Sequence, residues 1–156
     1  MATKRGVHGL ALALVVLVVS TVLGSATAMA TELSDYRWES RPLLVFAPTA
    51  NDPRLVETLN RVEATRCDFT GRDMVLGVVV PVGNSTIDGQ AIHADEARRL
   101  ANQFAIGDDA FSVVLVGKDG GEKLRVDDVP DLQRIYAVVD GMPMRGREMG
   151  ADPGRC

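Results

Sequence analysis

Apolar residues concentrate in three short runs in the part of the chain that follows residue 40. The runs cover residues 42–47, 75–80 and 111–116, and a proline follows each of the first two. Short continuous runs rich in β-branched residues are typical of strands that are buried on both faces of a sheet. The pattern therefore predicts three strands, with the first two at the centre of the sheet.

Three other stretches repeat apolar residues at helical spacing, i, i+3, i+4 and i+7. The positions are Leu55, Leu59 and Val62; then Ala97, Leu100, Ala101 and Phe104; then Leu132, Ile135, Tyr136 and Val139. Pro53 is placed for the first turn of the first helix, which we expect to end near Arg66. Gly141 and Pro143 are expected to end or kink the last helix.

A glycine-rich turn at residues 117–121 predicts a hairpin between the third strand and a fourth strand at residues 122–126. Residues 82–92 are polar and are predicted as a loop. The resulting order is βαβαββα, in which the helical crossovers imply parallel strands and the hairpin adds an antiparallel edge. This is the order of a thioredoxin-like α/β fold with a four-stranded mixed sheet flanked by helices.

The first 30 residues have the pattern of a secretory signal peptide. Lys4 and Arg5 precede an apolar run, and Ala28-Met29-Ala30 fits the small-x-small rule for cleavage before Thr31. Ala26-Thr27-Ala28 is a second candidate, two residues earlier. The run is shorter than the roughly 20 residues that a membrane-spanning helix requires. We therefore expect an exported protein, periplasmic or secreted, rather than an uncleaved membrane anchor.

The expected organisation is a signal peptide at residues 1–30, an N-terminal arm at 31–41, one thioredoxin-like domain at 42–149 and a flexible tail at 150–156. The arm carries Tyr36 and Trp38, whose rings we expect to dock onto the domain.

The net charge of the chain limits the classes of partner that it is expected to bind. The net charge is −4, and removal of the first 30 residues takes away two basic and no acidic residues, which leaves −6. An acidic surface argues against nonspecific binding to nucleic acid or to anionic lipid. We expect no nucleic-acid partner, and no membrane association after cleavage.

Metal and hydrolase chemistry have little support. His93 is the one histidine after the signal peptide, and we expect it to cap a helix or face solvent. Residues 84–95 only loosely resemble a calcium loop, since Asp95 stands where such loops have Glu and a strand precedes them. The acidic doublets at 108–109 and 127–128 are expected to be solvated loop charge. We expect no metal and no cofactor.

Thiol chemistry depends on where the cysteines lie. Thioredoxin-like enzymes place the attacking Cys between the first strand and the first helix, where the helix N-terminus stabilises a thiolate. Here residues 47–53 contain Thr49 and no cysteine, and Cys67 falls near the opposite end of that helix. The peroxidatic position is therefore not occupied by a thiol.

Several segments together resemble a known family. They are residues 111–125, residues 139–149, residues 42–48 and the pair Arg72-Asp73. They are similar to the domain of unknown function 4174, also called the P-DUDES domain, over about residues 33–149. That family is described as a peroxiredoxin-like branch of the thioredoxin-like superfamily, related to the extracellular equarin and sushi-repeat proteins. The resemblance implies a thioredoxin-like fold and no settled activity.

Two sets of residues remain candidates for a site. Lys118, Lys123, Arg125, Arg145 and Arg147 form a possible patch for an anion or a partner. The alternative is that Arg145 and Arg147 pair with nearby acids such as Glu148 or Asp140, or cap carbonyls at the end of the helix. Cys67 and Cys156 form a disulfide, remain unpaired thiols, or have a redox role. We expect a non-catalytic module that binds a protein or an anionic ligand; the alternative is a thiol-dependent oxidoreductase that uses Cys67 or Cys156.

Overall fold

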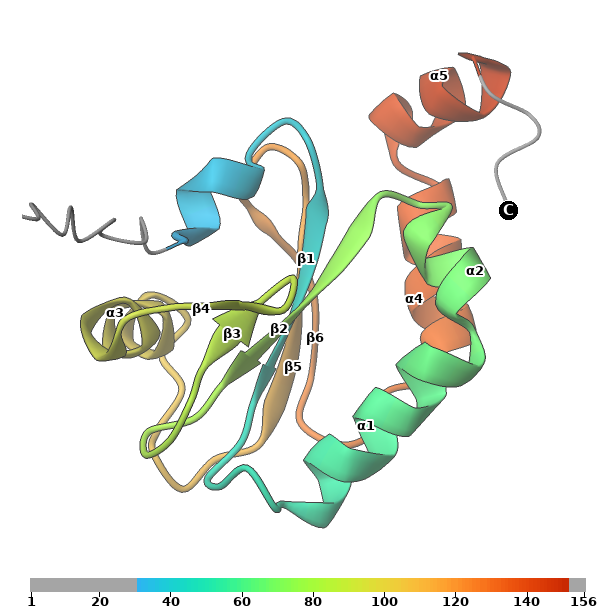
Figure 1. Cartoon of the computed structure of the whole chain (residues 1–156). Helices are drawn as coiled ribbons and strands as arrows, with labels where there is room; N and C mark the ends of the chain where they lie inside the picture. The colour runs from blue at the N-terminus through green and yellow to red at the C-terminus, as the bar shows by residue number, and fades with distance from the viewer. Residues whose placement is uncertain (1–30, 152–156) are drawn as a thin grey trace, which may run out of the picture.

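The computed structural model describes residues 31–151, in which six strands form one mixed sheet with the order β4-β3-β2-β1-β5-β6 (Figure 1). The elements are η1 (Leu33–Tyr36), β1 (Arg41–Phe46), α1 (Pro53–Ala64), α2 (Arg66–Thr70), β2 (Met74–Val79), β3 (Thr86–Ile87), β4 (Gln90–Ala91), α3 (Ala94–Gln103), β5 (Ser112–Val116), β6 (Glu122–Val126), α4 (Leu132–Asp140) and α5 (Pro143–Ala151). The predicted signal peptide and residues 152–156 lie outside the described residues.

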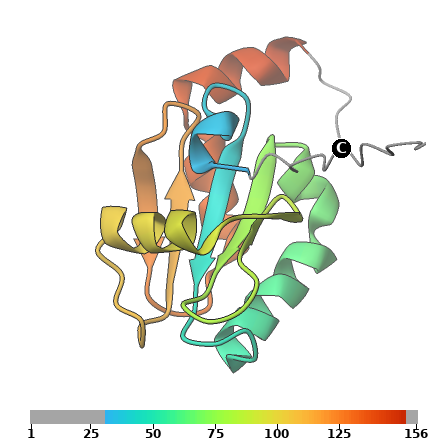
Figure 2. The same cartoon turned by 60° about the vertical axis from the view of Figure 1, so that its left-hand side comes forward.

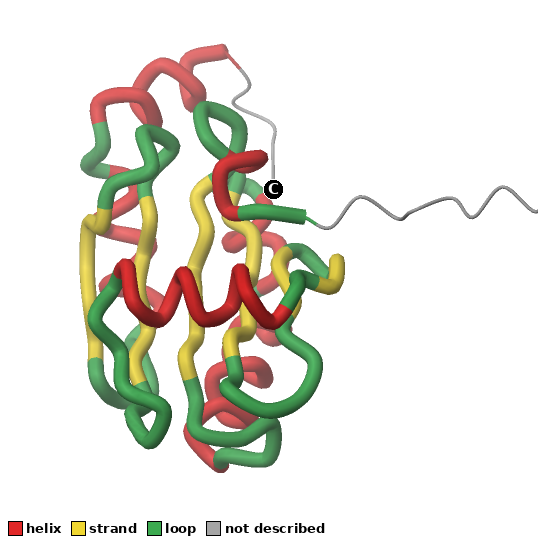
Figure 3. Tube along the Cα trace, turned by 90° about the vertical axis from the view of Figure 1, so that its left-hand side faces the viewer, coloured by secondary structure: helices red, strands yellow, loops and turns green. Residues whose placement is uncertain are grey.

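The sheet confirms the mixed α/β architecture and corrects two expectations, the number of strands and the direction of β5. β5 follows a helix and was predicted to be parallel, but it is antiparallel to β1 because α3 runs across the strands and does not return the chain along them (Figure 3). β1 pairs in parallel with β2 and antiparallel with β5, and β6 pairs antiparallel with β5. The prediction of four strands was wrong because residues 82–92, expected to form a loop, contain β3 and β4. These strands have two residues each, which is too short to show an alternation of apolar and polar residues. β3 is held in place by its pairing with Gly77 and Val78 of β2.

The sheet has a helical layer on each face. Leu43 and Val45 face the cluster that includes α1, α2 and α4, whereas Leu44 and Phe46 face the cluster that includes η1 and α3. Figures 1 and 2 show α1, α2 and α4 on one side of the sheet and α3 with η1 on the other. In Figure 3, α3 runs across the strands rather than along them.

The helix boundaries follow the local chemistry. Pro53 opens α1, and the N–H of Arg54 donates to the Asp52 carboxylate at 2.9 Å, which caps the helix. α1 ends at Ala64, just before the predicted end, and α2 follows after one residue. The predicted break after α4 is confirmed, since α5 begins at Pro143.

The two ends of the domain differ from the expectation. Tyr36 is docked, and its hydroxyl donates to the carbonyl of Ile87 at 3.2 Å. Trp38 is not docked: its side chain is 58% exposed and its backbone φ is 70°. Residues 150 and 151, expected in the tail, lie in α5. No helix within residues 31–151 is both long enough and apolar enough to cross a membrane.

Candidate functional site

The connection between β1 and α1 is the position at which this fold places a reactive thiol. Here Thr49 is exposed, and its carbonyl accepts the N–H of Asp52 at 3.2 Å. The Asp52 carboxylate accepts two hydrogen bonds from the Arg54 side chain, at 3.0 and 2.7 Å, and these bonds lower the pKa of Asp52. The N-terminus of α1 is therefore capped by a carboxylate of this chain.

Cys67 lies in α2, on the far side of α1 from Thr49. It is exposed and disulfide-bonded, so it carries no titratable thiol. Cys156 lies outside the described residues, and its pairing with Cys67 stays a prediction. Within residues 31–151, no three His, Cys, Asp or Glu side chains are grouped so that they could hold a metal ion.

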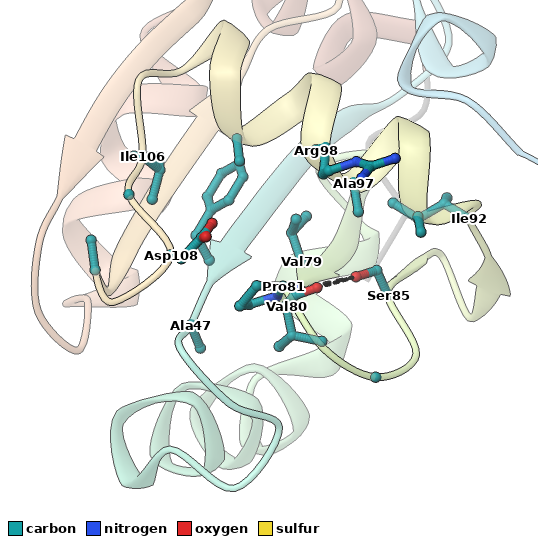
Figure 4. Close-up of a pocket in the computed structure, with 16 residues that line it drawn as sticks. Ala47, Val79, Val80, Pro81, Ser85, Ile92, Ala97, Arg98, Ile106 and Asp108 are labelled. Atoms are coloured by element: carbon teal, nitrogen blue, oxygen red, sulfur yellow. Dashed lines mark hydrogen bonds between the residues drawn. The ribbon is translucent and has the colours of Figure 1, made fainter.

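A cleft of about 120 Å³ opens between α3 and the C-terminal ends of β1 and β2 (Figure 4). We call it the α3 cleft. Its apolar lining is formed by Phe46, Ala47, Val79, Val80, Pro81, Ile92, Ala94, Ala97, Ala101, Ile106 and Ala110. The loop after β2 is anchored at the cleft because the Val80 N–H donates to the Ser85 hydroxyl at 3.0 Å and that hydroxyl donates back to the Val80 carbonyl at 3.2 Å.

The charged groups at the α3 cleft are few. Arg98 lines it and is paired with Asp95 on α3. Asp108 also lines the cleft and Asp109 follows it; both are exposed, and neither has an ion-pair partner among residues 31–151. The uncompensated charge beside this cleft is therefore negative.

The predicted basic residues lie toward the opposite end of the sheet and along β6, and most are paired. Lys118 is 9% exposed and contacts Asp73 at 2.8 Å and Glu148 at 2.7 Å. The remaining pairs are Arg145 with Asp140 at 3.4 Å, Lys123 with Asp119 at 2.6 Å and Arg125 with Glu122 at 2.7 Å. Arg147 is exposed and has no partner within the described part of the chain. The structure thus brings Lys118 and Arg145 into one charged cluster.

Sequence reasoning missed the centre of this cluster, Arg41. Its side chain is 1% exposed, forms two 3.0 Å hydrogen bonds with Glu148, and donates to the carbonyl of Arg72 at 2.9 Å. Burial alone would raise the pKa of Glu148, but the hydrogen bonds from Arg41 and Lys118 outweigh burial and lower it. The one available signal was an arginine at the start of a strand that is otherwise apolar.

The chain resembles known proteins over most of its length. The family described as "Domain of unknown function (DUF4174)" matches residues 32–148. Coiled-coil domain-containing protein 80 of Danio rerio is 28% identical in an alignment of length 133, and the match covers 75% of this chain and 15% of that protein. The chain therefore spans a small fraction of the length of this relative.

Solved structures show the same fold at low identity. The reduced 2-Cys peroxiredoxin of Plasmodium vivax is 12% identical, with a TM-score of 0.57 over 74% of this chain and 84% of that chain. Thioredoxin peroxidase I of Plasmodium yoelii is 16% identical, with a TM-score of 0.53 over 74% and 79%. A shared fold does not carry a shared activity. The match over residues 32–148 confirms the resemblance drawn from the sequence: the chain belongs to the DUF4174 family and has a peroxiredoxin-like, thioredoxin-like fold.

Proposed function

We propose that this protein is an exported thioredoxin-like module that binds a polypeptide partner and performs no thiol chemistry. The observation that carries the proposal is the β1–α1 connection, where Thr49 stands in place of a cysteine. A threonine hydroxyl cannot form the thiolate that attacks a peroxide or a disulfide. The carboxylate of Asp52 also occupies the N-terminus of α1, which is the electropositive end that would activate a thiol.

The charges support a polypeptide partner over a small anionic ligand. Lys118, Lys123, Arg125 and Arg145 each have a carboxylate within 3.4 Å, so an anion at these residues would compete with carboxylates that are already bound. Arg147 is the exception. Anion binding at that residue is therefore the alternative to a polypeptide partner.

The proposal is tested on the protein that begins at Thr31. We expect no consumption of hydrogen peroxide and no reduction of insulin disulfides above the buffer background. Turnover that is lost in Cys67→Ser or Cys156→Ser would replace the proposal with the oxidoreductase alternative. Turnover that the double variant Cys67→Ser/Cys156→Ser retains would also contradict the proposal, since it would reveal a catalytic group other than a cysteine.

Export is tested separately, by mass spectrometry of the protein recovered outside the cytoplasm of an expressing bacterium. The expected N-terminus is Thr31, since Ala28 and Ala30 occupy the positions that signal peptidase reads. Recovery of the full-length chain in the membrane fraction alone would contradict export.

A further inference from the structure

We infer that the α3 cleft binds a polypeptide segment that carries apolar side chains flanked by lysine or arginine. This inference rests on the proposed binding function and names the class of partner and the surface that receives it. The α3 cleft lies at the C-terminal ends of β1 and β2, on the α3 face of the sheet (Figure 4).

The small residues of α3 create the space. Four residues of α3 line the cleft, and three of them, Ala94, Ala97 and Ala101, are alanines; the fourth is Arg98. Ile92 and Ile106 contribute apolar walls from the segments on either side of α3. An apolar side chain placed here would exchange water for apolar contacts on several sides.

The exposed rim extends this apolar surface. Pro81 lines the cleft and is exposed, and the adjacent Val82 is 83% exposed, the highest value among the large exposed apolar residues of residues 31–151. The hydrogen bonds between Val80 and Ser85 hold the base of this loop. A segment seated in the cleft would contact Pro81 at the base of this loop.

The size of the cleft favours a single side chain of a polypeptide over a small-molecule ligand. A volume of about 120 Å³ is well below the roughly 300–1,000 Å³ of pockets that enclose small-molecule ligands or cofactors. It suits one anchoring side chain of a polypeptide whose backbone remains on the surface. This is the usual arrangement of an apolar anchor in a protein interface.

The charges at the rim indicate that the partner is positively charged. Arg98, which lines the cleft, is paired with Asp95, whereas Asp108 and Asp109 have no ion-pair partner among the described residues. The open carboxylates beside the apolar lining are complementary to a lysine or an arginine next to the anchor. Complementary charge of this kind speeds association and rejects partners of the wrong sign.

The test uses fluorescence anisotropy with three short labelled peptides, which alternate Lys with Leu, Glu with Leu, or Lys with Ser. We expect the Lys–Leu peptide to bind at least about tenfold more tightly than either of the others, because it alone has both features. Ala94→Trp fills the cleft, and the double variant Asp108→Lys/Asp109→Lys reverses the rim charge. Each is expected to weaken binding of the Lys–Leu peptide by about tenfold or more.

Two matched variants serve as controls. Ala64→Trp adds the same side chain at an exposed position of α1, and Glu39→Lys reverses an exposed charge before β1. Both should leave the affinity within about twofold, since rim charges far from a contact contribute little. Circular dichroism of every variant checks that it is folded before its binding is compared.

Equal affinity for the three peptides would overturn the inference, as would equal loss of binding in the cleft variants and their controls. Neither result bears on the absence of thiol turnover. The peroxide and insulin assays therefore decide the non-catalytic proposal independently of the α3 cleft.

Discussion

Arg41 and Glu148, which lie 107 positions apart in the chain, form a bidentate ion pair in which both N–O distances are 3.0 Å. Arg41 begins the central strand β1, and Glu148 lies in α5. Lys118, in the turn that follows β5, contacts the same carboxylate at 2.7 Å. The pair therefore attaches the C-terminal helix to one end of the sheet.

Glu148→Ala removes one acidic partner from two buried cations, Arg41 and Lys118. Loss of one member of a buried ion pair typically costs about 3–5 kcal/mol, because the remaining charge stays away from water. We expect the free energy of unfolding, measured in urea, to fall by about 3 kcal/mol. The matched control is Glu63→Ala, which breaks an exposed pair with Arg66 and should cost at most about 1 kcal/mol. Equal losses would show that the buried pair is not special.

The same carboxylate makes stability depend on acid. The folded pKa of Glu148 lies below its ordinary value of 4.5, because hydrogen bonds from Arg41 and Lys118 outweigh the opposing effect of burial. A lowered pKa means that the stabilisation is fully present above pH 4.5 and is lost as the pH falls through the lower folded value. The free energy of unfolding should decline below pH 4.5, and this decline should be smaller in Glu148→Ala. A decline of the same size in both proteins would assign the acid sensitivity to other carboxylates.

Leu44→Asp tests the core of the central strand. Leu44 is fully buried, and an aspartate there would place an unpaired charge against α3. We expect the domain to lose its cooperative unfolding transition in circular dichroism, since a buried unpaired charge lowers the free energy of unfolding by more than about 4 kcal/mol. Val82→Asp makes the same chemical change at a position that is 83% exposed, and should leave the melting temperature nearly unchanged. A folded Leu44→Asp protein would contradict the assignment of this strand to the core.

The cysteines are expected to pair with each other. A Cys67–Cys156 bond would close a loop of about 90 residues, which the chain-entropy model values at up to ~4.5 kcal/mol. Thiol titration of the unfolded, unreduced protein should detect no free thiol, and Cys67→Ser should lower stability without changing any activity. Two free thiols before reduction would contradict the pairing.

Strands β1, β2, β5 and β6, the main helices and the absence of a thiol at Thr49 could be predicted from the sequence because each depends on residues that are close together in the chain. Continuous apolar runs predicted β1, β2 and β5, and Pro143 predicted the break between α4 and α5. The local pattern had no comparable signal for β3 and β4, whose two-residue strands exist only through pairing with β2 and with each other.

The charged cluster and the α3 cleft were decided by tertiary structure. Nothing in the sequence near Arg41 indicates that a glutamate of α5 neutralises it. Trp38 was expected to dock because its side chain is large and aromatic, yet it is exposed. The spacing of apolar residues along the sequence indicates which face of an element is apolar, because the side chains that share a face recur at fixed intervals. It does not report which distant residues meet, because burial of an ion pair, or a space left beside three alanines, depends on how whole elements pack.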